Sequence, residues 1–374
     1  MEPRTMKDKR ILLVCSERSD GFETASDVEH FTKHPYSVRA ILYHLSLQGW
    51  QTCRAGWKTS SHLGSLAKRI DDFKPSIIYT YGSTVALNPL ICRRFLCKWK
   101  SFKVIHGWDD LYGDIWGEIA GWPGRLLMNV IERLIVTLSD HVITLSYFLH
   151  SRGKKWGVDC HYIPNGADVP IFDHSACTIR LEGEMKLVYT GDQAKWKKTA
   201  DICEAMRHVP NTIKLYLTGE HYAYLDSYAS DNCIFLGYVS KNDQMCVMNQ
   251  ADVLVSTADQ DCNAKLQEYL RFKKPILGYD GRMNFFFTNG RNALLTRDYP
   301  VALRHLAHDP QLRQLLATNA ERDLLVFTWS EIASQFHAFF CHMLANPDRS
   351  KTAVTGNRLR SSESIGKYFV QTTG

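Results

Sequence analysis

The sequence predicts an α/β protein made of two Rossmann-like domains, each a doubly wound parallel sheet, that face a cleft. The chain has 374 residues, whereas a typical domain has roughly 100–200. Short apolar runs alternate with stretches of helical spacing in both halves, which is typical of parallel sheets covered by helices on both faces. Prolines and glycines gather between residues 164 and 183, which indicates the junction of the two halves.

The first predicted domain, residues 1–170, opens with a buried strand directly after a charged start. Apolar residues between 37 and 48 recur with helical spacing on one face, and Gly49 ends this helix. A second, strongly apolar helix is expected at residues 126–138. The strands expected in this half are residues 11–15, 76–81, 103–106 and 141–146.

The second predicted domain, residues 171–330, repeats the alternation of strands and helices. Its expected strands are residues 186–190, 213–218, 233–236, 252–256 and 275–279. Residues 347–374 are polar, rich in Ser and Thr and without an apolar period. We therefore expect a disordered tail after the folded part of the chain.

The composition is that of an ordinary globular protein. With 45% apolar and 22% charged residues, the chain is not collagen-like, coiled-coil or wholly disordered. It has no uninterrupted apolar run of about 18 residues, and its N-terminus lacks the apolar core of a signal peptide. The eleven cysteines are scattered and form no C-x-x-C pair, so they are expected to be reduced, mostly buried thiols. These features predict a cytoplasmic location, which includes the inner face of the membrane.

The net charge of +6 is unevenly distributed, because the first 170 residues hold 22 basic and 17 acidic side chains. This excess is too weak for a nucleic-acid footprint, but it suits an anionic membrane or an anionic acceptor. Residues 91–103 hold five basic residues and no acid, interleaved with aromatic residues, and more aromatics follow in 108–122. The two segments indicate either peripheral contact with an anionic membrane or a packed helix with a solvated basic face.

The segment 251–279 carries the clearest chemical signal. A strand ends there, a polar loop follows, and a helix begins after Asn263, a residue type that favours helix N-caps. Open α/β sheets bind ligands at the carboxyl ends of their strands, where helix N-termini favour anions. Lys265 and Glu268 are three residues apart and share a helix face, so one can reach a phosphate while the other accepts hydrogen bonds from sugar hydroxyls.

This segment, which reads N-x-K-x-x-E-Y-L followed by K-P-I, resembles the nucleotide-binding signature of the family 4 retaining glycosyltransferases of the GT-B fold. Four further segments resemble that family in the same order along the chain: 162–168, 187–191, 235–239 and 327–330. The resemblance covers roughly residues 10–345. It implies a nucleotide-sugar donor bound by the second domain, an acceptor bound by the first, and a helix over 331–346 that crosses back to the first domain.

The resemblance implies a donor-binding set on the second domain. Glu268 matches the second glutamate of the family's E-x7-E motif, which binds the ribose hydroxyls. Lys197 fits the family lysine at the diphosphate, with Lys195 and Lys265 as substitutes. Gly191 ends the matching strand, and Asn263 precedes the binding helix. These cations stand where a metal-binding motif would otherwise be needed, so neither a metal nor another cofactor is expected.

The chain also departs from the family at two positions of this set. Gln260 stands at the first glutamate of the motif and is followed by Asp261. Either Asp261 or Gln260 is a candidate for the role of that glutamate, and backbone N–H groups are a third candidate for the sugar contacts. Asp192 stands where the family has an arginine. The donor sugar therefore does not follow from the resemblance.

On the first domain, His106 resembles the histidine that follows a strand in many GT-B transferases and contacts the donor sugar. Asp109 or Asp110 is expected to orient this imidazole or the acceptor hydroxyl. The catalytic candidates are thus His106, Asp109 and Asp261. Residues 17–36 replace a short glycine-rich loop of the family and are expected to shape the acceptor site.

The function that this resemblance implies is transfer of a sugar from a nucleotide sugar to an acceptor hydroxyl, with retention. The acceptor is expected to be a cell-surface glycan or a lipid-linked sugar. Two alternatives stay open: a nucleotide-sugar epimerase of the same fold, and a catalytically silent GT-B subunit that only binds a partner. A nicotinamide-dependent dehydrogenase is disfavoured, because no G-x-G-x-x-G fingerprint follows the first strand.

Overall fold

The computed structural model describes residues 9–15, 38–261 and 263–346, and the following account concerns these residues. The loop 17–36 and the tail 347–374 lie outside them, so the expectations for those segments stay predictions.

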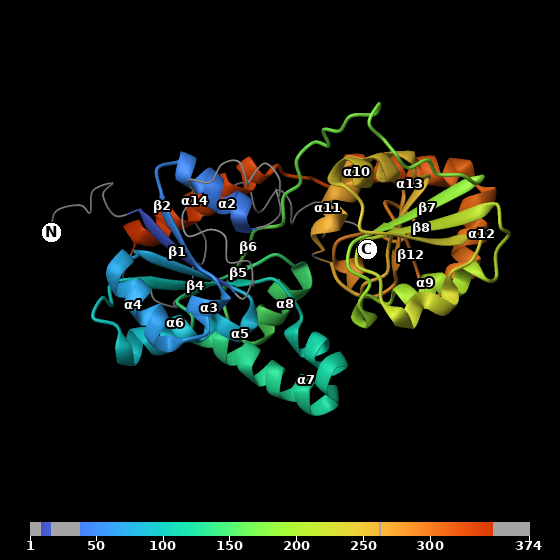
Figure 1. The fold of residues 1–374 in the computed structure, drawn as a ribbon. Helices are drawn as coiled ribbons and strands as arrows, with labels where there is room; N and C mark the ends of the chain where they lie inside the picture. The colour runs from blue at the N-terminus through green and yellow to red at the C-terminus, as the bar shows by residue number, and fades with distance from the viewer. Residues whose placement is uncertain (1–8, 16–37, 262, 347–374) are drawn as a thin grey trace, which may run out of the picture.

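Two parallel six-stranded sheets, one in each half of the chain, form the framework (Figure 1). The first sheet has the order β2-β1-β3-β4-β5-β6, and every neighbouring pair is parallel. Its strands are β1 (Arg10–Cys15), β2 (Gln51–Ala55), β3 (Ile77–Tyr81), β4 (Lys103–Trp108), β5 (His141–Thr144) and β6 (Cys160–Tyr162). Helices flank both sheets, so the predicted α/β fold class is confirmed.

The second sheet has the order β12-β11-β10-β7-β8-β9. Its strands are β7 (Met185–Thr190), β8 (Ile213–Thr218), β9 (Cys233–Gly237), β10 (Val253–Ser256), β11 (Ile276–Tyr279) and β12 (Leu294–Thr296). The chain runs outward from β7 to β9, returns to β10 on the other side of β7, and then runs outward again. The strand order therefore reverses between β7 and β10, where doubly wound sheets bind their ligands.

The predicted strands agree with the observed ones to within one or two residues, but three observed strands were missed. β2 carries the polar sequence QTCRA at the sheet edge, and β6 and β12 have three residues each. Such short or polar edge strands lack the apolar signal on which the prediction depended. Strand β4 also runs two residues beyond its predicted end, because Gly107 and Trp108 still pair with β5.

Helices connect the strands in both halves. Those of the first half are α2 (Val38–Leu47), α3 (Trp57–Ser60), α4 (Leu63–Phe73), α5 (Ser83–Ala86), α6 (Asn88–Ile91), η2 (Cys92–Leu96), α7 (Tyr112–Leu138) and α8 (Tyr147–Lys155). Those that follow are η3 (Lys195–Lys197), α9 (Thr199–Met206), η4 (Ala223–Tyr228), α10 (Lys241–Gln250), α11 (Ala264–Arg271), η5 (Arg282–Phe285), α12 (Tyr299–His308), α13 (Pro310–Asp323) and α14 (Trp329–Ala345).

Helix α14 packs beside α2 on the first sheet, although it follows the second sheet in sequence (Figure 1). Thr328 and Glu331 form a capping box at its start, as the residue types at these positions favour. Its buried Phe336 and Phe340 lie against Tyr79 of β3, with ring centroids 5.5 and 6.1 Å away. The C-terminal part of the described chain thus completes the core of the first sheet.

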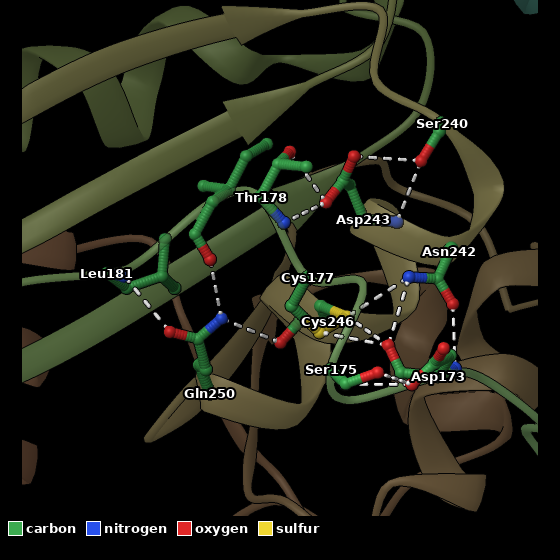
Figure 2. Close-up of a disulfide and its surroundings, with 11 residues drawn as sticks. Asp173, Ser175, Cys177, Thr178, Leu181, Ser240, Asn242, Asp243, Cys246 and Gln250 are labelled. Carbon is green, nitrogen blue, oxygen red and sulfur yellow. Dashed lines mark hydrogen bonds between the residues drawn. A yellow bond between two sulfur atoms is a disulfide. The ribbon is translucent and has the colours of Figure 1, made fainter.

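One disulfide fastens the segment between the sheets to the second half (Figure 2). Cys177 bonds to Cys246 of α10, and hydrogen bonds from Thr178 N to Asp243 and from Asp173 N to Asn242, each 2.8 Å, hold the segment along this helix. The expectation of reduced thiols is therefore wrong for this pair. The two cysteines are 69 residues apart, so their proximity is a tertiary feature. The other eight cysteines in the described ranges form no disulfide, and seven of them are buried.

The disulfide predicts a countable difference in thiol labelling. Alkylation of the denatured protein without reductant should modify two cysteines fewer than alkylation after reduction. Cys177→Ser should remove most of this difference and lower the free energy of unfolding by about 2–4 kcal/mol, because the bond restricts the unfolded chain. Mass spectrometry counts the labels, and Cys341→Ser, at a cysteine outside the pair, is the matched control. Equal labelling with and without reductant would rule the bond out.

Candidate active site

The candidate site lies at the carboxyl ends of β7 and β10, where two loops follow the strands. Gly191 directly follows β7 and has a φ of +103°. Gly219 directly follows β8 and has a φ of +111°. A side chain at Gly219 would collide with the Gly191 carbonyl, whereas the space beside the Gly191 Cα is open. Glycine is therefore required at Gly219 for close backbone packing, whereas at Gly191 it is favoured by the positive φ alone.

Two lysines converge on this place from different elements. Lys197 of η3 lies with its Nζ 3.3 Å from Asn263 Oδ1 and 3.5 Å from Gln260 Oε1. Lys265 of α11 donates from Nζ to the carbonyl of Thr190, at 3.2 Å. Burial, and then the nearby charge of Lys197, hold the pKa of Lys265 well below its usual value. Repulsion between two such ammonium groups is relieved when an anion binds between them.

The third predicted lysine points elsewhere. Lys195 is exposed, and its Nζ lies 5.7 Å from the ring centroid of Tyr224 on η4. Lys197 and Lys265 therefore lie close enough to interact electrostatically, whereas Lys195 is directed to the neighbouring helix.

Helix α11 begins at Ala264, as predicted, with Asn263 at the N-cap position. The Asn263 side chain makes no capping hydrogen bond; its Oδ1 accepts from Lys197 instead. Its Nδ2 is buried without a partner among the described residues. This amide group is thus directed to the lysines, with one donor left for a ligand.

Glu268 lies one helical turn after Lys265 but forms its ion pair with a lysine of another helix. Its Oε1 accepts from Lys241 Nζ, at 3.2 Å, at the start of α10. Burial raises the pKa of Glu268, and Lys241 opposes this shift. The carboxylate therefore stands at the edge of the site with a second cation beside it, a partner that sequence spacing did not indicate.

The loop after β10 reaches across to the first domain. Gln260 donates from Nε2 to Asp110 Oδ1 at 3.0 Å. Asp261 accepts from Ser146 Oγ at 2.5 Å and from Phe148 N at 3.0 Å, so it caps the start of α8. Both oxygens of Asp261 are thus engaged by the first domain, and its catalytic role stays a prediction.

Two adjacent carboxyl groups follow β4 and face this loop. Tyr112 and Tyr81 hydrogen-bond to Asp109, and burial together with the charge of Asp110 raises its pKa to about 7. Burial also raises the pKa of Asp110, while Lys197 and the hydrogen bond from Gln260 oppose this shift. A carboxyl group with a pKa near neutrality, as Asp109 has, can exchange protons with a ligand.

His106 does not end its strand as predicted, since β4 continues to Trp108. Its side chain is 1% exposed, and Nδ1 lies 2.9 Å from Thr80 Oγ1 on the neighbouring strand. Burial lowers the pKa of His106 to about 3, so the ring is neutral at pH 7. Its Nε2 has no partner within the described part of the chain, which leaves one ring nitrogen for an interaction.

Sequence reasoning missed four residues of this site: Tyr81, Tyr112, Lys241 and Arg282. Arg282 bridges the domains through Asp114, at 2.7 Å. Tyr112 could have been found, because it follows Asp109 by three residues at the start of a helix. The other three depend on contacts between distant segments. In the described ranges, no three or more His, Cys, Asp and Glu side chains are grouped so that they could hold a metal ion.

No family model and no curated protein sequence matches this chain, but solved structures do. Sucrose-phosphate synthase from Thermosynechococcus elongatus matches with a TM-score of 0.72 at 15% identity, over 90% of this chain and 99% of its own. HepE from Anabaena, in complex with UDP and glucose, matches with a TM-score of 0.63 at 15% identity, over 88% and 99%.

A UDP-GlcNAc 2-epimerase from Neisseria meningitidis, bound to UDP-GlcNAc, also matches, with a TM-score of 0.56 at 13% identity, over 89% of this chain and 100% of its own. Two facing parallel sheets, with a last helix returned to the first, are common to the GT-B architecture. The chain therefore has the GT-B fold.

The capping contacts of Asp261 predict a stability effect that crosses the domains. Asp261→Ala removes both hydrogen bonds to the start of α8 and should lower the free energy of unfolding by about 2–4 kcal/mol. It should also increase the radius of gyration in small-angle scattering. Asp309→Ala removes a comparable cap within the second half, at α13, and should cost only about 1 kcal/mol with no change of size. An Asp261→Ala protein as stable and as compact as the wild type would contradict this role.

Proposed function

We propose that the protein is a glycosyltransferase that moves a sugar from a nucleotide sugar to an acceptor hydroxyl. The observation that carries the proposal is the convergence of Lys197 and Lys265 at the point where the strand order of the second sheet reverses. Glu268 lies on the same helix as Lys265. A cationic pair and a carboxylate in this order suit the diphosphate and the ribose of one ligand.

The two lysines also suit the chemistry of the reaction. Cleavage of the sugar–phosphate bond builds negative charge on the departing diphosphate. A fixed cation stabilises that charge more strongly in the transition state than in the ground state, and so lowers the barrier. Because two lysine side chains are already in place, and a bound diphosphate would favour the protonated form of Lys265, we propose transfer without a metal.

The carboxylate of Glu268 can accept two hydrogen bonds from a vicinal diol such as that of ribose. Lys241 beside it opposes the rise in the pKa of Glu268 that burial causes, and its hydrogen bond to Oε1 limits the rotation of the carboxyl group. The complex of HepE with UDP and glucose supports a uridine nucleotide as the first donor to test. The sugar itself stays open, since Gln260 and Asp192 depart from the family pattern.

On the acceptor side, we propose that Asp109 receives or orients the acceptor hydroxyl. Its neighbour Asp110 interacts electrostatically with Lys197. Because the pKa of Asp109 is raised to about 7, this carboxyl group can gain or lose a proton at neutral pH. We propose that neutral His106 interacts with the ligand through its Nε2. Asp261 would hold the two domains in position through its contacts with the start of α8. Retention of configuration, with an oxocarbenium-like transition state, is part of the proposal.

We further propose that the acceptor is a cell-surface glycan or lipid-linked sugar, made at the cytoplasmic face of a membrane. This part is supported by the basic first domain. Disulfides such as Cys177–Cys246 are rare in reducing compartments, and cell fractionation tests the proposed location.

A second candidate is a nucleotide-sugar epimerase. The adjacent carboxyl groups of Asp109 and Asp110 favour it, because epimerisation needs acid and base groups near the sugar. The fold is shared with the Neisseria enzyme. Incubation with the donor alone separates the two candidates: an epimerase forms the epimer without any acceptor, and a transferase does not.

Donor binding should raise the thermal midpoint, and this effect should depend on Glu268. A ligand at 100 times its dissociation constant stabilises the folded state by about 2.7 kcal/mol. In a thermal-shift panel of nucleotide sugars, at least one donor should raise the midpoint of the wild type but not of Glu268→Ala. Glu321→Ala, at an exposed carboxylate paired with Lys273, should keep the full shift. A full shift in Glu268→Ala would show that this assignment of the site is wrong, and donor binding without transfer would favour the silent subunit.

The pKa of Asp109 predicts the pH dependence of the reaction. Its ionised form is the one that accepts a proton, so the rate should rise as pH increases through about 7 and level off above it. Asp109→Asn should lower the rate by about 100-fold or more and abolish this rise, since general-base catalysis contributes about 10²–10⁴-fold. Asp231→Asn, at an exposed position, should keep both. A pH profile unchanged in Asp109→Asn would exclude Asp109 as the base.

A further inference from the structure

Helix α7 exposes a continuous row of large apolar side chains. Its residues 126, 130, 134 and 138 follow at intervals of four, which places them on one helix face. The exposed fractions are 58%, 51%, 45% and 53% for Leu126, Val130, Leu134 and Leu138. The row is widened by Ile119, Trp122 and Leu127, which are exposed by 68%, 76% and 60%.

This exposure does not result from a loose helix. The opposite face of α7 is fixed to the sheet, where Met128, Ile135 and Val136 are buried. Glu132 on that face accepts from Trp108 Nε1 at 2.5 Å and pairs with Arg152 at 3.5 Å. The apolar row is therefore the outer surface of a helix whose orientation is set by other contacts.

The short helix η2 lies near the C-terminal end of α7 and also exposes apolar side chains. Arg93 pairs with Asp140 at 2.6 Å, which holds η2 beside the end of α7. The exposed apolar side chains of η2 and its neighbour are Ile91, Phe95 and Leu96, with Phe95 exposed by 74%. In Figure 1, α6 and α7 lie on one side of the first sheet, while α2 and α14 lie on the other. We call the exposed side chains of residues 91–101 and 118–138 the α7 face.

The charges on the α7 face are almost all positive. Its exposed basic residues are Arg94, Lys98, Lys100, Arg125 and Arg133. Glu118 is the one exposed acid in these two segments, because Glu132 is buried. Apolar side chains ringed by cations are the composition of helices that lie in the interface of anionic lipid bilayers.

We propose that the α7 face docks the protein on an anionic lipid bilayer. The apolar row would enter the boundary between headgroups and acyl chains, while the surrounding cations contact lipid phosphates. A second copy of the chain fits less well, since a two-fold interface would bring the same cations against one another. Within the described ranges, no helix is long and apolar enough to cross the bilayer.

The α7 face is connected to the candidate site by its own helix. Tyr112, the first residue of α7, hydrogen-bonds to Asp109. The helix breaks at Ala120 and Gly121, whose backbone angles are not helical. The exposed row follows this break, and Ile119 precedes it. If the proposed transfer reaction holds, a docked protein would receive its acceptor from the lipid phase; the docking itself does not depend on the reaction.

Flotation of the full-length protein with lipid vesicles tests the proposal. Vesicles of phosphatidylcholine mixed with an equal molar amount of phosphatidylglycerol should carry the protein, and vesicles of phosphatidylcholine alone should carry much less. Leu127→Glu combined with Leu134→Glu should reduce binding at least about tenfold. The triple change of Arg94, Lys98 and Lys100 to Gln should reduce it by about 100-fold at low salt.

The matched control is Val301→Glu with Leu315→Glu, which changes two equally exposed apolar positions on α12 and α13 (54% and 52%). This variant should float as the wild type does, and thermal denaturation should show that all variants are folded. Failure of the wild type to float with anionic vesicles, or equal flotation of the Leu127→Glu/Leu134→Glu variant, would overturn the proposal. The proposal would also be overturned if the wild type formed a dimer in solution and did not bind vesicles, while the Leu127→Glu/Leu134→Glu variant was monomeric. Sugar transfer is measured separately with a soluble acceptor, so loss of either property does not affect the test of the other.

Discussion

The loop between β10 and α11 is the constraint on which the site depends, because it is bonded to both halves of the molecule. Gln260 and Asp261 hold it to Asp110 and to the start of α8 in the first domain. A few residues further on, Asn263 holds Lys197 in the second. The carboxyl groups of one domain and the cations of the other are thereby fixed at a set separation. Such preorganisation is what an electrostatically driven transfer requires.

Desolvation gives this arrangement its chemical character. Burial disfavours the charged form of every titratable group, so it lowers the pKa of Lys265 and raises that of Asp109. Without a ligand the site therefore holds less charge than its residues suggest. A bound diphosphate would favour protonation of Lys265, and the charge of Lys197 would then act in a medium of low dielectric constant, where it is most effective.

The local features of this fold could be predicted from the sequence, and those that depend on long-range contacts could not. The buried strands and the start of α11 follow from apolar periodicity and from Asn263, whereas α14 was implied by the family resemblance. The pairing of Glu268 with Lys241, the Cys177–Cys246 disulfide and the burial of His106 each join segments that are distant in sequence or depend on where a strand ends. Periodicity carries no information on these contacts. The Lys197–Lys265 pair lies between these cases, because resemblance indicated both residues but not that Lys195 points away.

Helix α7 shows why an apolar pattern does not determine which helix face is buried. The apolar residues between 126 and 138 predict a helix, yet the face of that helix that packs carries Glu132 and glycine as well as apolar residues. Burying Glu132 raises its pKa to about 7, and it is stabilised there by Trp108 and Arg152. Because these contacts fix the helix without its leucines, the stability of the domain does not explain the exposed row. A second apolar environment, supplied from outside the chain, would account for it.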